Sequence, residues 1–437
     1  MRYAPLTLTT LASLVPPELD AEIHLIDEGV DEIDAGKLEA DLVGITAITG
    51  TAPRAYEIAA EFRRRDIPVV LGGVHPTLVP EEAQQHADAI CVGYAEESWP
   101  QLLRDFAAGR MQRRYDQSPN LSLAGLPFPR RDLYDTSLVN VAHTIEATRG
   151  CIYQCEFCVV PAAWGKPIQK PVADVVADIR QMRAKRLIFL DLNLIADFDY
   201  AKELFTALIP LKIKWGGLAT TQLGWDEELL DLAARSGCRG ILIGFESLAE
   251  DSLHEMKKSF NARRSYTEVV QRIHDRGIAI MGCFVFGFDH DTPEIFLETA
   301  QLAVEARIDL PRFAILTPFP GTPLYARLER EGRILTRNWE LYDAQHVVFA
   351  PARLTPDQLQ RGTEQAWRYA YRYRSILKRI RRSPAPLLVR VAANLGYRHY
   401  AHHLHRFYTC DWYIGPHAGT PPRHAQVRGA AAAQPGP

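Results

Sequence analysis

Two series of alternating strand-like and helix-like segments limit the fold of this chain more than any other feature. Between residues 143 and 317, six short apolar runs are separated by amphipathic stretches such as 226–237 and 294–306. Six β/α units in series predict a parallel sheet curved into a complete or partial (β/α)6 barrel, with its site at the carboxyl ends of the strands. The expected strands are "HTIEATR" (143–149), "RLIFLDL" (186–192), "KWGGLATT" (214–221), "RGILIGFE" (239–246), "IAIMGCFVFG" (278–287) and "RFAILTP" (312–318).

A shorter series of the same kind fills residues 20–105. Helical patterns at 52–65 and 80–87 separate the apolar runs, which predicts a doubly wound, flavodoxin-like α/β domain with a ligand crevice at the carboxyl ends of its strands. The expected strands are "EIHLIDE" (22–28), "ADLVGIT" (40–46), "PVVLGG" (68–73) and "AICVG" around Cys91.

The chain has 437 residues, which is too long for one ordinary domain. A polar, proline-rich stretch separates the two α/β series, and a tail rich in Ala, Gly and Pro closes the sequence and is expected to be disordered. The predicted parts are an α/β domain (1–105), a linker (106–142), a barrel (143–325), a helical C-terminal region (326–414) and a tail (415–437).

Three of the seven cysteines lie within eight positions, directly after the first strand of the predicted barrel. Cys151, Cys155 and Cys158 have the spacing C-x3-C-x2-C. A cubane [4Fe–4S] cluster normally takes four thiolates, so three leave one iron with an open position for an external ligand. A structural zinc ion wants four protein ligands. Zinc with a distant fourth ligand, and three incidental buried thiols, remain as alternatives.

This cysteine spacing after the first strand of a six-unit barrel resembles the radical S-adenosylmethionine (SAM) superfamily. The resemblance implies a [4Fe–4S] cluster held by the three cysteines, with SAM bound to the open iron. In that superfamily an electron from the cluster cleaves SAM to methionine and a 5′-deoxyadenosyl radical, which abstracts a hydrogen atom from the substrate.

The resemblance also implies SAM-binding residues at the ends of several strands. "LDLNL" (190–194) departs from the GGE-like motif common in the superfamily at that place. "IGFES" (243–247) and "TPFPGTPLY" (317–325) follow the fourth and sixth strands, although a helix cap and a proline-rich turn are the plain alternatives. The residues implied to contact SAM are Phe157, Asp191, Asn193, Glu246, Ser247 and Pro318.

The N-terminal domain is similar to the cobalamin-binding domain that precedes many radical SAM barrels. Small residues after successive strands would let a large flat macrocycle approach the backbone. The D-x-H-x-x-G signature is absent, so no lower histidine ligand is assigned, and His75 is not taken as one. An internal first strand is missing, so a domain that kept its fold and lost the cofactor remains an alternative. The residues implied to face cobalamin are Thr46, Thr49, Gly72, Gly73 and Gly93.

The C-terminal region mixes aromatic and basic residues over 368–390, with almost no acids. This composition fits a helix that lies on an anionic membrane surface or binds an acidic partner. The alternative is a solvated helix whose aromatic residues pack on the barrel. The formal net charge of −3 and the lack of a supporting motif give no reason to expect nucleic-acid binding.

Together these features predict an enzyme that generates a 5′-deoxyadenosyl radical and methylates an unactivated carbon of a small molecule, lipid or natural-product intermediate. Ring formation, rearrangement or oxidation without methyl transfer is one alternative, and a non-catalytic cofactor-binding sensor is another. An electron donor such as flavodoxin or ferredoxin is the expected partner. The first twenty residues lack a secretory signal pattern and no apolar run reaches 18 residues, so a reducing cytoplasm is the expected location.

Overall fold

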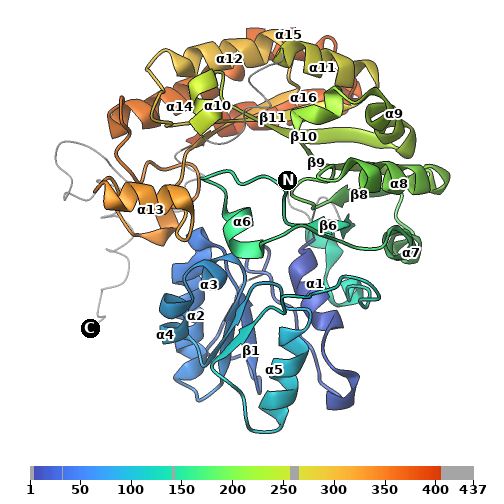
Figure 1. The fold of residues 1–437 in the computed structure, drawn as a ribbon, viewed down its shortest axis with the longest axis vertical. Helices are drawn as coiled ribbons and strands as arrows, with labels where there is room; N and C mark the ends of the chain where they lie inside the picture. The colour runs from blue at the N-terminus through green and yellow to red at the C-terminus, as the bar shows by residue number, and fades with distance from the viewer. Residues whose placement is uncertain (1–3, 32, 140–142, 256–264, 405–437) are drawn as a thin grey trace, which may run out of the picture.

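The computed structural model describes residues 4–31, 33–139, 143–255 and 265–404. Two parallel sheets organise the chain, one in the N-terminal domain and one in the central barrel (Figure 1). The N-terminal domain, in blue, lies at one end of the long axis of the molecule, and the C-terminal helices, in orange and red, pack on the barrel at the other. The two predicted α/β units and the helical region that follows them are therefore confirmed.

The N-terminal sheet has four parallel strands in the order β1-β2-β3-β4. Its strands are β1 (Val43–Thr46), β2 (Val69–Gly72), β3 (Ala89–Val92) and β4 (Arg114–Asp116). The helices of the domain are α1 (Leu6–Ser13), α2 (Ala52–Arg63), α3 (Val74–Leu78), α4 (Pro80–His86) and α5 (Ser98–Ala107), with short 3-10 turns at Pro17–Leu19 and Thr49–Thr51. Since β4 lies in the range predicted as linker, the sheet extends beyond residue 105, and two 3-10 turns, Arg131–Leu133 and Thr136–Leu138, follow it.

The strand predicted at 22–28 does not form, so this prediction is wrong. In a flavodoxin-like order the strand at that point pairs with the first strand of the chain. The described residues supply no strand beside the outer edge of β1. Without that neighbour the 22–28 segment has no ladder to join, because an extended segment becomes a strand only when it pairs with another.

The barrel sheet has six parallel strands in the order β12-β11-β10-β9-β8-β5. All six predicted strands are present, and the ends β5 and β12 do not pair with each other in the described residues, so the barrel is partial. The strands are β5 (Thr144–Ile145), β8 (Arg186–Phe189), β9 (Lys214–Ala219), β10 (Cys238–Glu246), β11 (Ala279–Phe286) and β12 (Leu310–Ile315).

Helices between the strands cover the outer face of the barrel sheet, whereas the helix at Val159–Trp164 lies between the barrel and the N-terminal domain (Figure 1). Their ends carry recognisable signals: Asp226 accepts a hydrogen bond from the Leu229 amide at the start of α9, and Gly237 ends that helix at a φ of 103°. The helices are α6 (Val159–Trp164), α7 (Val172–Met182), α8 (Phe198–Leu208), α9 (Glu227–Ser236), α10 (Glu250–Glu255), α11 (Tyr266–Asp275), α12 (Ile295–Glu305) and α13 (Pro323–Arg330), with 3-10 turns at Ile209–Leu211 and Thr221–Gly224.

The first predicted barrel strand, 143–149, divides into two short pieces. Only β5 joins the barrel sheet, where it pairs with β8. After it the chain leaves the sheet, and β6 (Thr148–Arg149) pairs antiparallel with β7 (Ile168–Gln169). The cysteine segment lies between β6 and β7, so this small ribbon closes its base.

The C-terminal region packs its aromatic residues on the barrel. Trp367 and Tyr371 are buried, and their indole N–H and phenolic O–H donate to the carbonyls of Phe313 and Pro311, at 2.9 Å each. The buried Arg379 donates to the Asp309 carbonyl at 2.6 Å. The elements are the 3-10 turn η8 (Trp339–Leu341) and helices α14 (Pro356–Ala370), α15 (Tyr373–Ile380) and α16 (Leu387–His402).

The predicted disordered tail, 415–437, lies outside the described residues. No helix in the described part of the chain combines the length and the apolar character that crossing a bilayer requires.

Candidate functional site

The cysteine segment is a loop between β6 and α6 with a fixed entry and exit. Gly150 opens it at a φ of 78°, and a Cβ there would lie 3.1–3.3 Å from the backbone of Lys166 and Pro167, so only glycine fits. The amide of Cys158 donates to the carbonyl of Cys155 at 3.1 Å, and Cys158 directly precedes α6. Cys155 is buried, whereas Cys151 and Cys158 are partly exposed.

The loop is held against the carboxyl ends of the barrel strands. The Tyr153 hydroxyl donates to the Gln222 side chain, just after β9, at 2.6 Å. The ring of Phe157 meets Phe288, after β11, edge to face at 6.2 Å between centroids. The Glu156 carbonyl accepts the Leu324 amide at the start of α13 at 3.1 Å. The three thiols therefore lie at the functional face that the β/α alternation predicts.

The three cysteines are the candidate metal ligands of the loop. Among the described residues, no three His, Cys, Asp or Glu side chains converge on one point in a way that would hold a metal ion. A zinc ion needs its ligands around one centre. A cubane cluster binds each thiolate at a different corner iron, so it accepts thiols that are spread along a loop. Three thiols from one loop are the donor type that such a cluster requires.

Asp191 binds the backbone just before the cysteine loop. Its carboxylate is fully buried and accepts the amides of Ala147 and Thr148 and the Thr148 hydroxyl, the last at 2.8 Å. Burial, and after it the charge of Glu146, raises the pKa of Asp191 to about 7. These bonds fix the point where the chain leaves the barrel.

Asn193 has the environment of a ligand-binding residue. Its side-chain nitrogen lies 4.0 Å from the Cys151 sulfur, and its buried side-chain oxygen has no hydrogen-bond partner among the described residues. The buried hydroxyl of Thr220, at the end of β9, also lacks one there. Unsatisfied buried polar atoms are costly, so two of them at neighbouring strand ends indicate a polar ligand. The residues present therefore fit SAM beside the cysteine loop.

Glu246 and Ser247 end β10 in an unusual conformation. Glu246 is buried and has a φ of 66°, in the left-handed region that non-glycine residues rarely adopt, and the register with β11 shifts between Gly244 and Glu246. The Tyr266 hydroxyl bonds the Phe245 and Ser247 carbonyls at 3.0 and 2.8 Å. Pro318 is buried just after β12, at the same face of the sheet. Such local strain is typical of binding sites.

The loops after the N-terminal strands contain the residues predicted to face cobalamin. Gly73 and Gly93 have φ values of 97° and 83°, and a Cβ on Gly73 would come within 2.7 Å of the Thr46 hydroxyl. These two glycines are therefore required for the packing of the loops themselves. Thr46 is exposed, and Gly72 is partly exposed with ordinary space around it.

Thr49 does not face the crevice freely. It is buried, and its hydroxyl lies 3.4 Å from Nδ1 of His75, which is itself fully buried with Nε2 at 3.0 Å from the Tyr56 hydroxyl. Burial lowers the pKa of His75. Ile48 in the same loop is 60% exposed, which leaves an apolar group at the carboxyl edge of the sheet. An apolar, glycine-lined edge fits the flat face of a macrocycle, with Thr46, Ile48 and Gly72 as the available surface.

A buried ion pair joins the two domains next to the cysteine loop. Arg149 bonds Glu96 of the N-terminal domain and, through Nε at 2.6 Å, Glu146 of the barrel. Its guanidinium lies 4.7 Å above the ring of Tyr94, which stacks on Trp164 of α6 at 4.5 Å. Burial alone would lower the pKa of Arg149, but the two carboxylates outweigh it and raise the pKa. Sequence reasoning missed this group, although two charges inside a predicted barrel strand are a usable signal.

A second contact joins the N-terminal domain to the segment after the barrel. The Trp339 indole donates to both Glu82 oxygens, at 2.9 and 3.2 Å. Glu82 in turn lies 3.0 Å from the Tyr56 hydroxyl and 3.4 Å from His75. His75 is thereby part of an interdomain network and not a free ligand.

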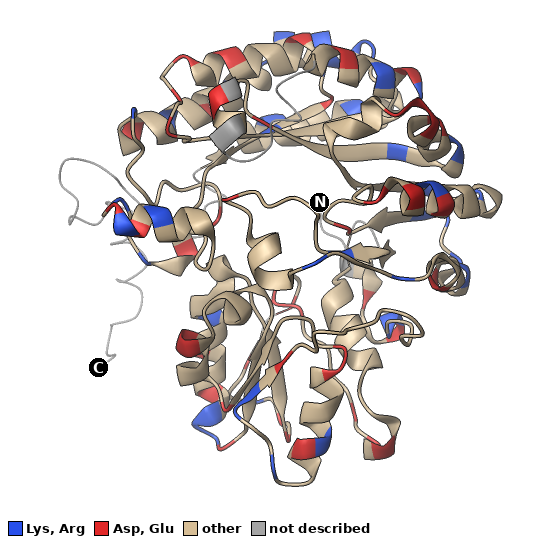
Figure 2. Cartoon of the chain, viewed as in Figure 1, with Lys and Arg blue, Asp and Glu red and all other residues tan. Residues whose placement is uncertain are grey.

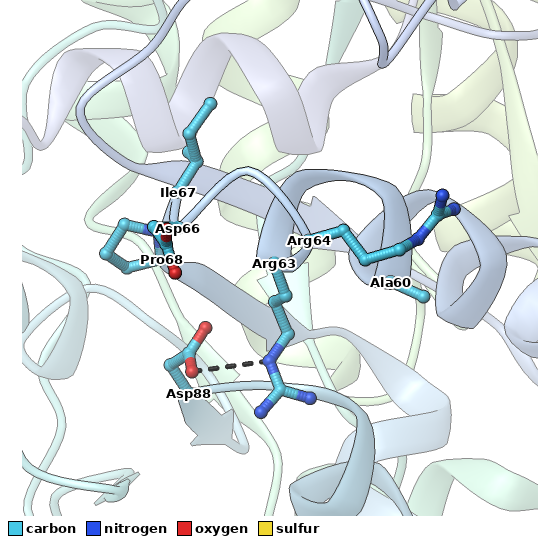
Figure 3. A pocket seen from close by; sticks show the side chains of 7 residues that line it. All are labelled: Ala60, Arg63, Arg64, Asp66, Ile67, Pro68 and Asp88. Carbon is cyan, nitrogen blue, oxygen red and sulfur yellow. Dashed lines mark hydrogen bonds and ion pairs between the residues drawn. The ribbon is translucent and has the colours of Figure 1, made fainter.

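A hollow of about 520 Å³ lies elsewhere, between the end of α2 and the start of β2 (Figure 3). Arg63 points across it and bonds Asp88 at 3.3 Å, and Asp88 also accepts the Val69 amide at 2.8 Å. It opens at the amino ends of the strands, opposite the ligand edge of a doubly wound sheet, so it is not the cofactor crevice.

The thiol loop lies at the carboxyl face of a partial barrel, and a buried ion pair joins this barrel to a doubly wound domain. This combination defines a class of enzymes that bind two kinds of cofactor. Residues 145–303 match the radical SAM superfamily, and residues 18–103 match the B12 binding domain. The chain belongs to the family of radical SAM enzymes that carry an N-terminal B12-binding domain. A [4Fe–4S] cluster, SAM and cobalamin are the cofactors of this family, so membership of the family confirms the three predicted cofactors.

The curated relatives include several methyltransferases. Bacteriochlorophyllide d C-12(1)-methyltransferase of Chlorobaculum tepidum is 33% identical over 87% of this chain and 85% of its own length. Bacteriochlorophyllide d C-8(2)-methyltransferase of the same organism is 32% identical over 92% and 93%. Hopanoid C-2 methylase of Rhodopseudomonas palustris is 25% identical over 86% and 72%.

Solved structures that share the fold include the following two. The radical SAM methyltransferase TsrM of Kitasatospora setae, with cobalamin and a [4Fe–4S] cluster bound, aligns with a TM-score of 0.62 at 20% identity over 75% of each chain. The cobalamin-dependent radical SAM enzyme OxsB with aqua-cobalamin bound aligns with a TM-score of 0.66 at 16% identity, over 92% of this chain and 70% of its own. At these identities the likeness concerns the fold.

Proposed function

We propose that this chain is a cobalamin-dependent radical SAM methyltransferase that adds a methyl group to an unactivated carbon of a tetrapyrrole side chain. The observation that carries the proposal is the thiol loop at the carboxyl face of the barrel, joined to the B12-binding domain by Arg149 and Glu96. The two bacteriochlorophyllide methyltransferases support the substrate class, because the similarity spans nearly the whole of both chains.

In this proposal Cys151, Cys155 and Cys158 hold the cluster. SAM lies between that loop and the strand ends, where the free side-chain oxygen of Asn193 accepts from its amino group. When bound, these groups supply a one-electron cleavage of SAM and a carbon-centred radical. The protein positions the reactants and excludes water, since the cofactors carry the difficult chemistry.

The remaining predicted residues complete the SAM site. Phe157, packed edge to face on Phe288, offers an aromatic wall beside the cysteine loop. Glu246 and Ser247 present polar groups from the strained end of β10, and Pro318 closes the site after β12. Each role is tested by the change in the Kd of SAM after substitution.

Cobalamin occupies the carboxyl edge of the N-terminal sheet in this proposal. Thr46, Ile48 and Gly72 contact the macrocycle, while Gly73 and Gly93 shape the loops that carry those contacts. The buried Arg149–Glu96 pair keeps this edge at a fixed distance from the cysteine loop. Methyl transfer needs that constancy, because misplacement of about 1 Å can cost about 100-fold in rate.

A small iron–sulfur or flavin protein, such as ferredoxin or flavodoxin, supplies the electron. The enzyme works in a reducing cytoplasm, where clustered thiols remain free to bind the cluster.

The experiment is anaerobic reconstitution followed by turnover with SAM that carries a trideuterated methyl group and bacteriochlorophyllide d as substrate. We expect 5′-deoxyadenosine and a product that carries the deuterated methyl. A Cys151→Ala/Cys155→Ala/Cys158→Ala variant should lose both, and a variant with Cys238→Ala, a buried thiol away from the loop, should retain both.

The outcomes separate the alternatives. 5′-Deoxyadenosine with an altered but unlabelled product would replace methylation by ring formation or oxidation. This alternative rests on the anaerobic magnesium-protoporphyrin IX monomethyl ester cyclase of Cereibacter sphaeroides, which is 25% identical over 64% of its own length. Turnover of a hopanoid instead of the tetrapyrrole would move the substrate class to polycyclic lipids.

A further inference from the structure

Helices α15 and α16 form a hairpin whose exposed face the proposed chemistry does not use. The Arg398 guanidinium, near the end of α16, lies 3.9 Å above the ring of Tyr373 at the start of α15, and it also bonds the Tyr371 carbonyl at 2.9 Å. Arg390, in the first half of α16, bonds the Ser383 carbonyl at 2.7 Å in the connecting loop. The helices therefore run antiparallel, and the end of α15 lies beside the start of α16.

The inner face of this hairpin is buried and packs on the barrel. Ser375, Ile376 and Arg379 of α15 are buried, and Arg379 donates to the carbonyls of Asp309 and Ala370 at 2.6 and 2.8 Å. The hairpin is thus packed on the barrel through this face, and its other face is left to the solvent.

The outer face exposes large apolar side chains at the joined end of the hairpin. Leu388 is 84% exposed, and Leu377, Leu387 and Val389 are each between 58% and 60% exposed. Three consecutive apolar residues in water at the first turn of a helix are unusual, because such side chains normally lie in the core. A partner that accepts apolar side chains is therefore indicated.

Exposed basic residues lie on the same hairpin as these apolar side chains. The 40 residues 365–404 contain nine Lys and Arg and no Asp or Glu, in a chain of net charge −3. Arg374, Lys378 and Arg381 are exposed and follow the i, i+4, i+7 spacing of one helical face. Figure 2 shows Lys and Arg at the position of α15, at the end of the molecule opposite the N-terminal domain.

We propose that this hairpin binds the surface of an anionic phospholipid membrane. Leu377, Leu387, Leu388 and Val389 enter the interface between headgroups and acyl chains, and the basic residues pair with the headgroups. Apolar residues flanked by Lys and Arg are the pattern of helices that lie in this plane. The exposed basic residues lie on α15 and just after it, beside the apolar side chains at the joined end of the hairpin, so one anionic surface can meet both kinds of side chain.

The position of the hairpin makes this contact compatible with the enzyme. α15 lies at the opposite end of the long axis from the N-terminal domain (Figure 1), so a membrane at the hairpin leaves the domain clear. This inference does not depend on the proposed reaction, since it concerns the outer face of the C-terminal helices alone.

The test is sedimentation of the full chain with vesicles of phosphatidylcholine alone or with 30% phosphatidylglycerol (about one anionic lipid in three). We expect binding to the anionic vesicles that weakens as salt rises, and little binding to the neutral ones. Arg374→Glu/Lys378→Glu/Arg381→Glu should weaken it on the order of 100-fold, at roughly 1 kcal/mol for each basic residue lost. The matched control is Arg64→Glu/Arg113→Glu/Lys185→Glu, which changes the net charge equally at exposed sites elsewhere.

A second pair of variants tests the apolar contact. Leu387→Ser/Leu388→Ser should lower the affinity for anionic vesicles about tenfold, whereas Phe128→Ser/Leu335→Ser, at exposed apolar sites elsewhere, should leave it unchanged. Equal binding to both lipid compositions would overturn the proposal, and so would binding to duplex DNA without binding to vesicles. Self-association that the leucine variants abolish, with no vesicle binding, would assign the face to a second copy of the chain and overturn it as well.

Discussion

The buried ion pair between Arg149 and Glu96 should fix the N-terminal domain to the barrel, and its removal should loosen that domain measurably. The side chains are 9% and 3% exposed. Breaking a buried pair by removing one partner costs about 3–5 kcal/mol, because the remaining charge is left unpaired. Arg149 keeps Glu146 at 2.6 Å, so roughly half of that cost applies, about 2 kcal/mol.

The variant is Glu96→Gln, which preserves shape and removes the charge. The readout is amide hydrogen exchange of β3, resolved by mass spectrometry, because opening of the domain exposes its central strands. A loss of about 2 kcal/mol corresponds to exchange roughly 30-fold faster. The neighbouring Glu97→Gln is the matched control, since Glu97 is exposed and should change nothing.

A double-mutant cycle with Arg149→Met isolates the pair from other effects of each substitution. If the two groups interact as the structure places them, the combined variant should lose about 2 kcal/mol less than the sum of the single losses. Additive losses within about 0.5 kcal/mol would refute the reasoning. The same result would remove the support that this pair gives to a fixed distance between the two cofactor sites.

Three further predictions concern single residues. Burial is the main reason why the pKa of Asp191 is raised to about 7. The folded state therefore keeps a proton that the unfolded state releases near pH 4, and this proton stabilises the fold. The stabilisation is complete at low pH and is lost as the pH rises through 7. The wild-type urea midpoint should therefore fall between pH 5 and 8, and Asp191→Asn should flatten that fall. Gly73→Ala should cost about 1–3 kcal/mol in thermal or urea unfolding because of its positive φ, whereas Gly72→Ala should change stability by less than about 0.5 kcal/mol. Trp339→Phe should cost about 1.5–3 kcal/mol in urea unfolding of the N-terminal domain, since it removes a hydrogen bond to the Glu82 carboxylate; an unchanged midpoint would contradict that bond.

Much of the fold could be predicted from sequence because hydrophobic periodicity and local caps act within short segments. All six barrel strands overlap the apolar runs that predict them, and along β11 each buried residue alternates with a partly buried one. The prediction of a strand at 22–28 was wrong because strand formation also depends on pairing outside the segment. Its apolar pattern is adequate, but its pairing depends on a neighbour that the local sequence does not report.

The functional site, like the fold, could be predicted only in part from the sequence. The cysteine loop could be located because thiol chemistry and spacing identify it without tertiary information. The role of Asp191 could not, because a carboxylate at a strand end has the same sequence signature whether it binds a ligand or the backbone of Ala147 and Thr148. The Arg149–Glu96 pair spans 53 positions, so neither partner reveals the other along the chain.

The contact between Trp339 and Glu82 spans 257 positions and has a consequence for synthesis on the ribosome. The N-terminal domain leaves the ribosome first, and translation proceeds at about 5–20 residues per second. Glu82 therefore waits roughly 10–50 s for its partner to be made. During that interval the contact between α4 and the Trp339 segment cannot form, so this part of the boundary between the domains closes only after the barrel has been synthesised.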